Sequence, residues 1–317
     1  MERPQEGGCE ELESFLQSLG NEIKDSDDAD EETYDLYAQD LPSADLGIID
    51  PKATELQLTV AGRELTIHQS PGILSSARAG GTTGAVIELG AGTSAIVGLL
   101  LAPRVGRYVL TDQAYVSKLV ERNINENWSS AVQQQQQQKT SLVGSGGSGS
   151  NGQGGKGKKG GAGGKWSKKA ASSSSSSSTG DKILATEEGP GERLVFRALD
   201  WEQDTPTSSL AQPVAASFDL VVACDCIYNE ALVDPFVATC VDICKLRGNN
   251  GGRPTVVVVA QVLRTSDVFE AWIKRFVQDF RCWRVPDDMM IDGLKSEGGG
   301  GGTSGFVVHI GVLREGR

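Results

Sequence analysis

The stretch Val86-Ile-Glu-Leu-Gly-Ala-Gly-Thr-Ser-Ala95 decides the fold of this chain. A short apolar run passes through a Gly-x-Gly turn directly into residues with helical spacing of apolar side chains. Gly90 and Gly92 allow the backbone to turn tightly and a ligand to approach it closely. The free amides at the start of the helix favour a carboxylate or another negatively charged group. The stretch therefore predicts a buried strand, a ligand-binding turn and a helix.

From Val86 onward, apolar runs alternate with helical periodicity, which is the pattern of a parallel sheet covered by helices. We predict an α/β fold with a seven-stranded, mostly parallel Rossmann-like sheet and helices on both faces, preceded by a β-hairpin over residues 55–60 and 64–68. The expected strands are residues 86–89, 107–111, 194–199, 218–224, 255–261, 282–285 and 306–313. The expected helices are residues 94–101, 114–127, 231–245 and 267–280.

Two segments have compositions that do not build a core. Residues 1–50 are acidic, and we expect them to be mostly disordered, although Leu12, Phe15, Leu16 and Leu19 could form one short amphipathic helix that docks. Residues 129–191 contain six consecutive glutamines, a Gly/Ser/Lys tract and seven consecutive serines, and are read as a disordered insertion. Residues 51–317 are then a single domain that this insertion interrupts.

The formal net charge of −12 disfavours direct binding to nucleic acid and favours a basic partner. The N-terminus has no signal-peptide character, and no run approaches the about 20 apolar residues of a membrane span. We therefore expect no membrane and a cytoplasmic location, with the nucleus as the alternative. The six cysteines are then reduced thiols. A zinc site at Cys224-x-Cys226 and Cys240-x-x-x-Cys244 is not favoured, because no histidine is suitably spaced. The sequence says nothing about oligomeric state.

Asp112 ends the second expected strand, where a carboxylate binds ribose hydroxyls in nucleotide-binding α/β folds. Its other interpretation is a cap for the following helix. These features fit two cofactors, because Gly90, Gly92 and Ala95 also satisfy the dinucleotide fingerprint of NAD-binding proteins.

Three other features favour S-adenosylmethionine over NAD. Glu88 directly precedes the glycine turn, where it can restrain the loop or bind the ligand's ammonium through water. Asp200-Trp201 ends the third strand and offers an acid and a flat ring beside an adenine, although Trp201 could equally be a packing residue. The pattern closes with a final strand pair instead of a second catalytic domain.

Residues 218–228 predict a fully buried strand that brings Asp225 and Tyr228 to its carboxyl end, where ligands bind in open α/β sheets. An amine substrate needs an acceptor that orients it and a wall beside it. We predict these two roles for Asp225 and Tyr228, since alignment provides most of the catalysis when the electrophile is already activated.

Several motifs together resemble the fungal ribosomal lysine N-methyltransferase 5 family, which is similar to the wider group of seven-strand protein-lysine methyltransferases. They are residues 67–76, 81–86, 88–92, 104–113, 199–201 and 225–228, and the resemblance covers about residues 55–130 and 190–315. It implies methyl transfer from S-adenosylmethionine to a lysine of a large-subunit ribosomal protein. By position, it implies cofactor contacts at Gly90, Ala91, Gly92, Asp112, Trp201 and Cys224, and an acceptor motif at Asp225 and Tyr228.

The chain departs from the family at one place. Relatives have a tryptophan-containing segment and a helix between the Gly-Thr-Thr-Gly-Ala-Val stretch and the first strand, whereas Val86 here continues straight into Ile87. We expect part of one sheet face to be uncovered as a result. A catalytically weak or inactive ribosome-associated binding protein is therefore an alternative, and an NAD-dependent oxidoreductase is a third.

Overall fold

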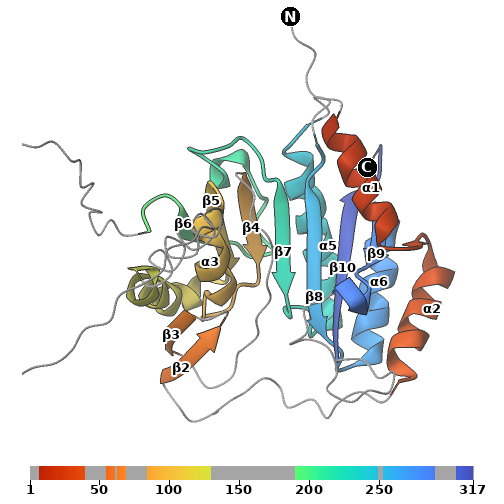
Figure 1. Cartoon of the computed structure of the whole chain (residues 1–317), viewed down its shortest axis with the longest axis horizontal. Coiled ribbons are helices and arrows are strands. Elements are labelled where there is room, and N and C mark those ends of the chain that lie inside the picture. Colours follow the sequence, from red (N-terminus) through yellow and green to blue (C-terminus); the bar gives the residue numbers. More distant parts are fainter. Residues whose placement is uncertain are drawn as a thin grey trace, which may run out of the picture.

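The computed structural model describes residues 7–39, 84–129, 190–248, 253–289 and 305–316, and the backbone of residues 55–60 and 63–68. Its centre is an eight-stranded sheet in the order β1-β9-β10-β8-β7-β4-β5-β6 (Figure 1). The expected Rossmann-like α/β fold is confirmed, with one strand more than the seven expected. None of the helices in this part of the chain has the length and apolar character that a membrane crossing requires.

Seven strands form close to the expected positions, because runs of β-branched and apolar residues favour a sheet that is buried on both faces. Strands β4 to β8 run parallel, and β10 pairs antiparallel with both β8 and β9. These strands are β4 (Ala85–Leu89), β5 (Arg107–Asp112), β6 (Leu194–Ala198), β7 (Leu220–Cys224), β8 (Val256–Val262), β9 (Phe280–Arg284) and β10 (Phe306–Leu313).

The strand order reverses beside β4, and this reversal fixes the position of the site. The chain runs outward from β4 to β5 and β6 and then returns to β7 on the other side of β4. Loops at the carboxyl ends of β4 and β7 therefore leave in opposite directions. The crevice between such loops is where open α/β sheets bind ligands.

Helices cover both faces of the sheet (Figure 1). α5 (Val233–Lys245) and α6 (Ser266–Asp279) pack on one face through a cluster that includes Phe236 and Phe276. α3 (Ile96–Leu101) and the helix of residues 117–129 pack on the other face over β4 and β5. Three-residue 3-10 helices supply short turns: η1 (Ala102–Arg104), η2 (Ala114–Val116), η3 (Ser208–Leu210), η4 (Glu230–Leu232) and η5 (Asp287–Met289).

The N-terminal segment differs from the expectation of a mostly disordered stretch over residues 1–50. Residues 7–39 form α1 (Gly7–Ser18), β1 (Glu22–Ile23) and α2 (Ser26–Tyr37), and β1 pairs antiparallel with β9. The docking expected for the first helix is found. Leu16 and Leu19 pack against Trp283 and Ile310, with Leu12 partly buried beside them and Phe15 46% exposed.

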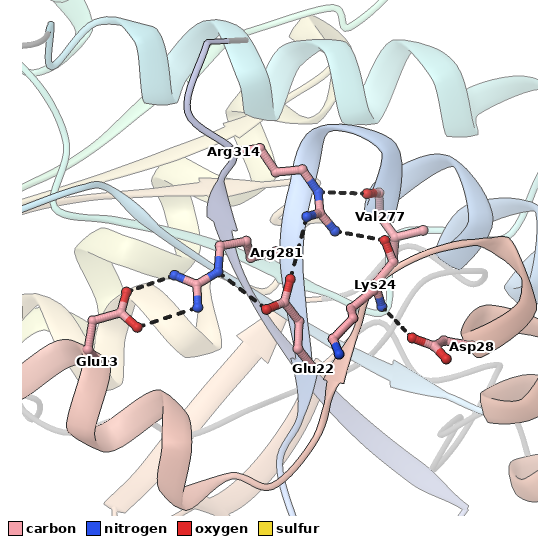
Figure 2. A network of polar contacts seen from close by, with 7 residues as sticks. All are labelled: Glu13, Glu22, Lys24, Asp28, Val277, Arg281 and Arg314. Carbon is pink, nitrogen blue, oxygen red and sulfur yellow. Dashed lines mark hydrogen bonds and ion pairs between the residues drawn. The ribbon is translucent and has the colours of Figure 1, made fainter.

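Arginines from distant strands explain why this acidic segment is ordered (Figure 2). Arg281 binds Glu13 at 2.8 Å and Glu22 at 3.4 Å, and Arg314 lies 3.5 Å from Glu22. Arg314 also donates to the Lys24 carbonyl at 2.8 Å. The acidic residues that predicted a solvated segment therefore form ion pairs with arginines near one edge of the sheet. β1 covers that edge by pairing with β9.

The expected hairpin forms as β2 (Glu55–Val60) and β3 (Arg63–His68). Most of the expected insertion, residues 130–189, lies outside the described residues, so the proposed single-domain organisation stays a prediction. β4 is continuous from Ala85, in agreement with the direct passage from Val86 into Ile87. On the face that carries α1 and α3, several apolar side chains of β7 and β8 are only partly buried, among them Leu220, Val256, Val258 and Ala260.

Candidate active site

One pocket lies at the carboxyl ends of β4, β5, β6, β7 and β8, and it encloses about 470 Å³. This volume is within the range of small-molecule sites. All nine residues that the sequence singled out line this pocket: Glu88, Gly90, Ala91, Gly92, Asp112, Trp201, Cys224, Asp225 and Tyr228. The structure therefore brings together residues that are up to 140 positions apart in the chain, as from Glu88 to Tyr228.

The glycine turn lies directly against the pocket. Gly90 and Gly92 have φ angles of +67° and +61°, a region that favours glycine. A Cβ on Gly90 would lie 2.5 Å from the Cβ of Cys226 and 3.3 Å from the Trp201 ring. The turn therefore requires glycine at position 90 both for its conformation and for its packing. The helix that follows is shorter than expected, since α3 begins at Ile96.

Asp112 holds this turn from the end of β5. Its Oδ2 accepts a hydrogen bond of 2.9 Å from the Gly92 amide, and its Oδ1 accepts one of 2.7 Å from the Gln113 amide. Burial raises the pKa of the Asp112 carboxyl, and these two amides lower it in part. Each oxygen keeps further acceptor capacity toward the pocket.

Glu88 is a buried carboxyl group beside the glycine turn. The Tyr108 hydroxyl donates a 2.7 Å hydrogen bond to its Oε2. Burial raises the pKa of Glu88 to about 7, the Tyr108 bond lowers it, and the nearby Asp112 charge raises it. Glu88 can therefore change its protonation state near neutral pH, which would alter the charge of the pocket.

Trp201 and Cys224 complete the apolar part of the lining. The Trp201 ring packs edge-on against Phe236 with centroids 5.3 Å apart, and its buried Nε1 has no hydrogen-bond partner among the described residues. Trp201 is therefore both packed and exposed to the pocket. Burial raises the pKa of the Cys224 thiol, so this side chain stays protonated.

Asp225 has an unusual backbone and a charged partner. It adopts a φ of +53°, which only a few non-glycine residues do, and its amide donates to the Ala260 carbonyl at 2.7 Å. Both carboxylate oxygens accept hydrogen bonds from the two terminal nitrogens of Arg264, and Oδ1 also accepts from the Val262 amide at 3.3 Å. The side chain is 7% exposed, so Asp225 is one half of a largely buried ion pair.

Two exposed tyrosines, Tyr115 and Tyr228, frame the opening of the pocket. Burial raises the pKa of the Tyr228 hydroxyl, and Tyr115 and Asp112 raise it further. Tyr228 is 72% exposed and Tyr115 is 77% exposed. Their rings are thus available to a side chain that enters the pocket from solvent.

The sequence analysis missed Arg264 and Tyr115. Arg264 follows β8 by two residues, and Tyr115 follows β5 by three, so both lie at the carboxyl edge of the parallel sheet. The rule that selected Asp112 and Asp225 selects these positions too. This rule does not predict that Arg264 pairs with Asp225, because the two residues are 39 positions apart in the sequence.

Comparisons with known proteins agree with the geometry of the pocket. The model of the lysine methyltransferase family matches residues 180–272, which include the Asp225–Tyr228 motif. The chain is 26% identical to ribosomal lysine N-methyltransferase 5 of Saccharomyces cerevisiae over 219 residues, which are 65% of this chain and 52% of the yeast protein. It is also 30% identical to the diaminohydroxyphosphoribosylamino-pyrimidine deaminase of Schizosaccharomyces pombe over 150 residues. These residues are 38% of this chain and 35% of that protein. The chain spans about half or less of the length of these two relatives.

Several solved structures, among them one of an N-methyltransferase, align over most of this chain. The N-methyltransferase NodS from Bradyrhizobium japonicum, in complex with S-adenosyl-L-homocysteine, aligns with a TM-score of 0.32 and 12% identity over 73% of this chain and 79% of NodS. The YcgJ protein from Bacillus subtilis aligns with a TM-score of 0.34 and 10% identity over 74% of this chain and 94% of YcgJ.

Proposed function

Because this chain belongs to the lysine methyltransferase family, we propose that it transfers a methyl group from S-adenosylmethionine to a lysine side chain of a protein. S-adenosylmethionine, the cofactor expected from the sequence, is the methyl donor of such enzymes. One observation carries the proposal for this chain. The glycine turn, Asp112 and the Asp225–Tyr228 motif surround a single pocket of about 470 Å³.

We assign the cofactor to the side of the pocket formed by β4, β5 and β6. Gly90, Ala91 and Gly92 line this side, and the glycine backbone there allows the amino-acid portion of the cofactor to approach closely. Asp112 has free acceptor capacity for ribose hydroxyls, and Trp201 offers a ring for the adenine, with Cys224 beneath. The ionised form of Glu88 attracts an ammonium group. Bound there, the cofactor supplies an activated methyl group.

We assign the lysine to the side formed by β7 and β8. A lysine must arrive as the neutral amine to accept a methyl group, and partial desolvation in the pocket lowers its pKa. A lone carboxylate would oppose this, since it stabilises the ammonium form. Asp225 is already paired with Arg264, so it offers an acceptor without a net charge. A carboxylate has about four acceptor positions, and Arg264 and Val262 occupy three of them.

Tyr228 and Tyr115 are proposed to guide the lysine. Flat rings on either side of an alkyl chain restrict its orientation without forming hydrogen bonds to the amine. Such alignment lowers the barrier of a displacement in which the electrophile is already activated. Together, Asp225 and Tyr228 would hold the amine with its lone pair toward the methyl group.

For the substrate, we propose a basic protein of the large ribosomal subunit. The yeast relative is named for ribosomal lysine methylation, and it matches this chain over 52% of its own length. The net charge of −12 supports a basic partner, because complementary charge speeds the encounter of proteins. We accordingly propose a cytoplasmic location, with the nucleus as the alternative.

The first test is a calorimetric titration of the purified chain with S-adenosylmethionine, with NAD as the control. Micromolar binding of S-adenosylmethionine alone is the expected result. Binding of NAD instead would favour the oxidoreductase alternative, which the comparisons do not support. The absence of binding to either would favour a binding protein without activity.

The second test measures transfer of labelled methyl groups to purified large-subunit ribosomal proteins. Tyr228→Ala should lower the transfer rate about tenfold or more by removing one wall of the lysine path. Tyr34→Ala is the matched control, because Tyr34 on α2 is 73% exposed, like Tyr228, and lies outside the pocket lining. Equal rates for the two variants would contradict the assigned role of Tyr228.

A further inference from the structure

Glu88 is an acidic residue in a strand whose other side chains are apolar. β4 reads Ala85-Val-Ile-Glu-Leu89, and all five residues are buried. Glu88 is 3% exposed, and it lines the pocket. An ionised carboxylate is costly to bury unless other groups donate hydrogen bonds to it. The groups that surround Glu88 therefore decide whether it presents a charge to the cofactor.

Tyr108 of β5 donates such a hydrogen bond. β4 and β5 run side by side in parallel, and Glu88 pairs with Leu110, two residues after Tyr108 (Figure 1). Tyr108 and Leu110 belong to the same apolar cluster, on the face of the sheet that carries α3. The Tyr108 hydroxyl donates to Glu88 Oε2 at 2.7 Å. Because Tyr108 is completely buried and does not line the pocket, it holds Glu88 from a fixed position outside the ligand space.

The second carboxylate oxygen of Glu88 remains open to the pocket. The described residues donate no other hydrogen bond to this carboxyl group. Glu88 Oε1 is also not one of the unpaired polar atoms that are sealed from solvent. This oxygen therefore keeps contact with the pocket, and its acceptor positions are left for a ligand. The Thr111 hydroxyl binds the backbone carbonyl of Glu88 at 2.7 Å, so it holds the main chain and leaves the carboxyl group free.

The groups around Glu88 act on its charge in opposite directions. Burial and the Asp112 charge favour the protonated form, the Tyr108 hydrogen bond favours the ionised form, and the pKa of Glu88 is about 7 as a result. On β7 and just after it, burial raises the pKa of the Cys224 and Cys226 thiols, so both stay neutral. On the helical side, α3 contains no titratable residue, and the charged residues of the helix over 117–129 are exposed.

We propose that Tyr108 is a positioning residue of the cofactor site, which keeps Glu88 ionised through Oε2 and leaves Oε1 to accept the ammonium group of S-adenosylmethionine. The inference rests on the proposed function for the identity of this cofactor. Tyr108 lies outside the pocket lining, so its effect on the cofactor passes through Glu88. Loss of its hydroxyl favours the protonated form of Glu88 and weakens cofactor binding at the pH values where that form is populated.

The first experiment compares Tyr108→Phe with Thr111→Val as the matched control. Each variant removes one buried hydroxyl that binds Glu88 at 2.7 Å, but only the Tyr108 hydroxyl binds the carboxyl group. The Kd for S-adenosylmethionine is measured by calorimetry from about pH 6 to about pH 9. The ratio of variant to wild-type Kd cancels the titration of the cofactor itself.

For Tyr108→Phe, this ratio should be about tenfold at the acidic end of the range and should fall toward one at the basic end. The reason is that Glu88 is fully ionised in both proteins once the pH is high enough. For Thr111→Val, the ratio should be independent of pH. A Tyr108→Phe ratio that stays constant over the whole range would overturn the inference, because it would indicate a structural defect only.

A double-variant cycle tests whether Tyr108 acts through Glu88. In a Glu88→Gln background, which has no carboxylate to ionise, the addition of Tyr108→Phe should change the Kd for S-adenosylmethionine by less than about twofold at every pH. A further loss close to the loss in the single variant would also overturn the inference, since Tyr108 would then act by another route.

A readout without cofactor is the pH titration of the Glu88 carboxyl carbon by NMR in the unliganded protein. Its midpoint should move to higher pH in Tyr108→Phe and keep the wild-type value in Thr111→Val, and an unmoved midpoint in Tyr108→Phe would contradict the proposed positioning. If the wild-type chain bound S-adenosylmethionine with the expected pH dependence but transferred no methyl group to protein, the proposed function would fail while this inference would stand. If it bound no S-adenosylmethionine, the cofactor role of Tyr108 would fail as well.

Discussion

Asp112 and Asp225 occupy equivalent places in the sequence pattern, yet the structure gives them different partners. Asp112 is the last residue of β5, Asp225 directly follows β7, and both line the same pocket. Asp112 is held by two backbone amides, from Gly92 and Gln113. Asp225 is held by the guanidinium of Arg264. One carboxylate therefore keeps its charge toward the ligand, and the other belongs to a neutral pair.

Because their partners differ, the two carboxylates suit two different ligand groups within one pocket. A charged acceptor suits ribose hydroxyls, since hydrogen bonds to an ionised group are stronger than those to a neutral one. A neutralised acceptor suits an amine that must lose its proton before it reacts. The Asp112 charge also acts on Glu88, because it raises the pKa of that carboxyl group.

The largest effect is expected from Asp225→Ala. It leaves the Arg264 charge unpaired in a pocket where its side chain is 25% exposed, which should lower the free energy of unfolding by about 3 kcal/mol. Methyl transfer should fall about a hundredfold as the acceptor is lost. Urea denaturation and the transfer assay measure the two effects.

The matched control is Asp225→Ala combined with Arg264→Leu. The double variant should recover part of the lost stability, because it removes the unpaired charge, but it should recover none of the activity. If the single variant were as stable as wild type, the ion pair would contribute nothing to the fold and the comparison with Asp112 would lose its basis.

A smaller effect is expected from the pH dependence of Glu88. Its folded-state pKa of about 7 lies above the ordinary value of 4.5. The stabilisation by the protonated group is therefore complete below pH 4.5 and is lost as pH rises through 7. Between pH 5 and pH 6.5, the contribution of Glu88 to the free energy of unfolding should fall by about 2 kcal/mol.

Comparison of wild type with Glu88→Gln by denaturation at several pH values isolates this contribution, since glutamine does not titrate. The difference in stability between the two proteins should follow the predicted fall over this range. A constant difference would show that Glu88 keeps an ordinary pKa in the folded protein.

The smallest effect is expected from Asp112→Asn, which keeps an oxygen for the Gly92 amide but removes the charge. The Kd for S-adenosylmethionine should rise about tenfold, whereas stability should change by less than about 1 kcal/mol. The pKa of Glu88 should also fall, since the Asp112 charge helps to raise it. Titration calorimetry over a pH series measures both quantities, and an affinity equal to that of wild type would contradict the ribose assignment.

The sequence by itself determined the sheet, the glycine turn and the residues around the pocket. Apolar runs define strands, and in a parallel sheet the residue after each run lies at the ligand-binding edge. Gly90, Asp112, Trp201 and Asp225 could therefore be identified from local pattern alone. The acidic N-terminal segment was misjudged for the same reason, because its local pattern is that of a solvated chain.

Only the tertiary structure decided which charges meet. Glu13 and Arg281 are 268 residues apart, and Glu32 and His309 are 277 apart, so no periodicity or spacing relates them. Arg264 pairs with Asp225 because β7 and β8 are neighbours in the sheet, and Tyr37 packs on Phe269 because α2 packs on α6. Local patterns follow from the period of a helix or strand, whereas these pairings depend on how finished elements pack together.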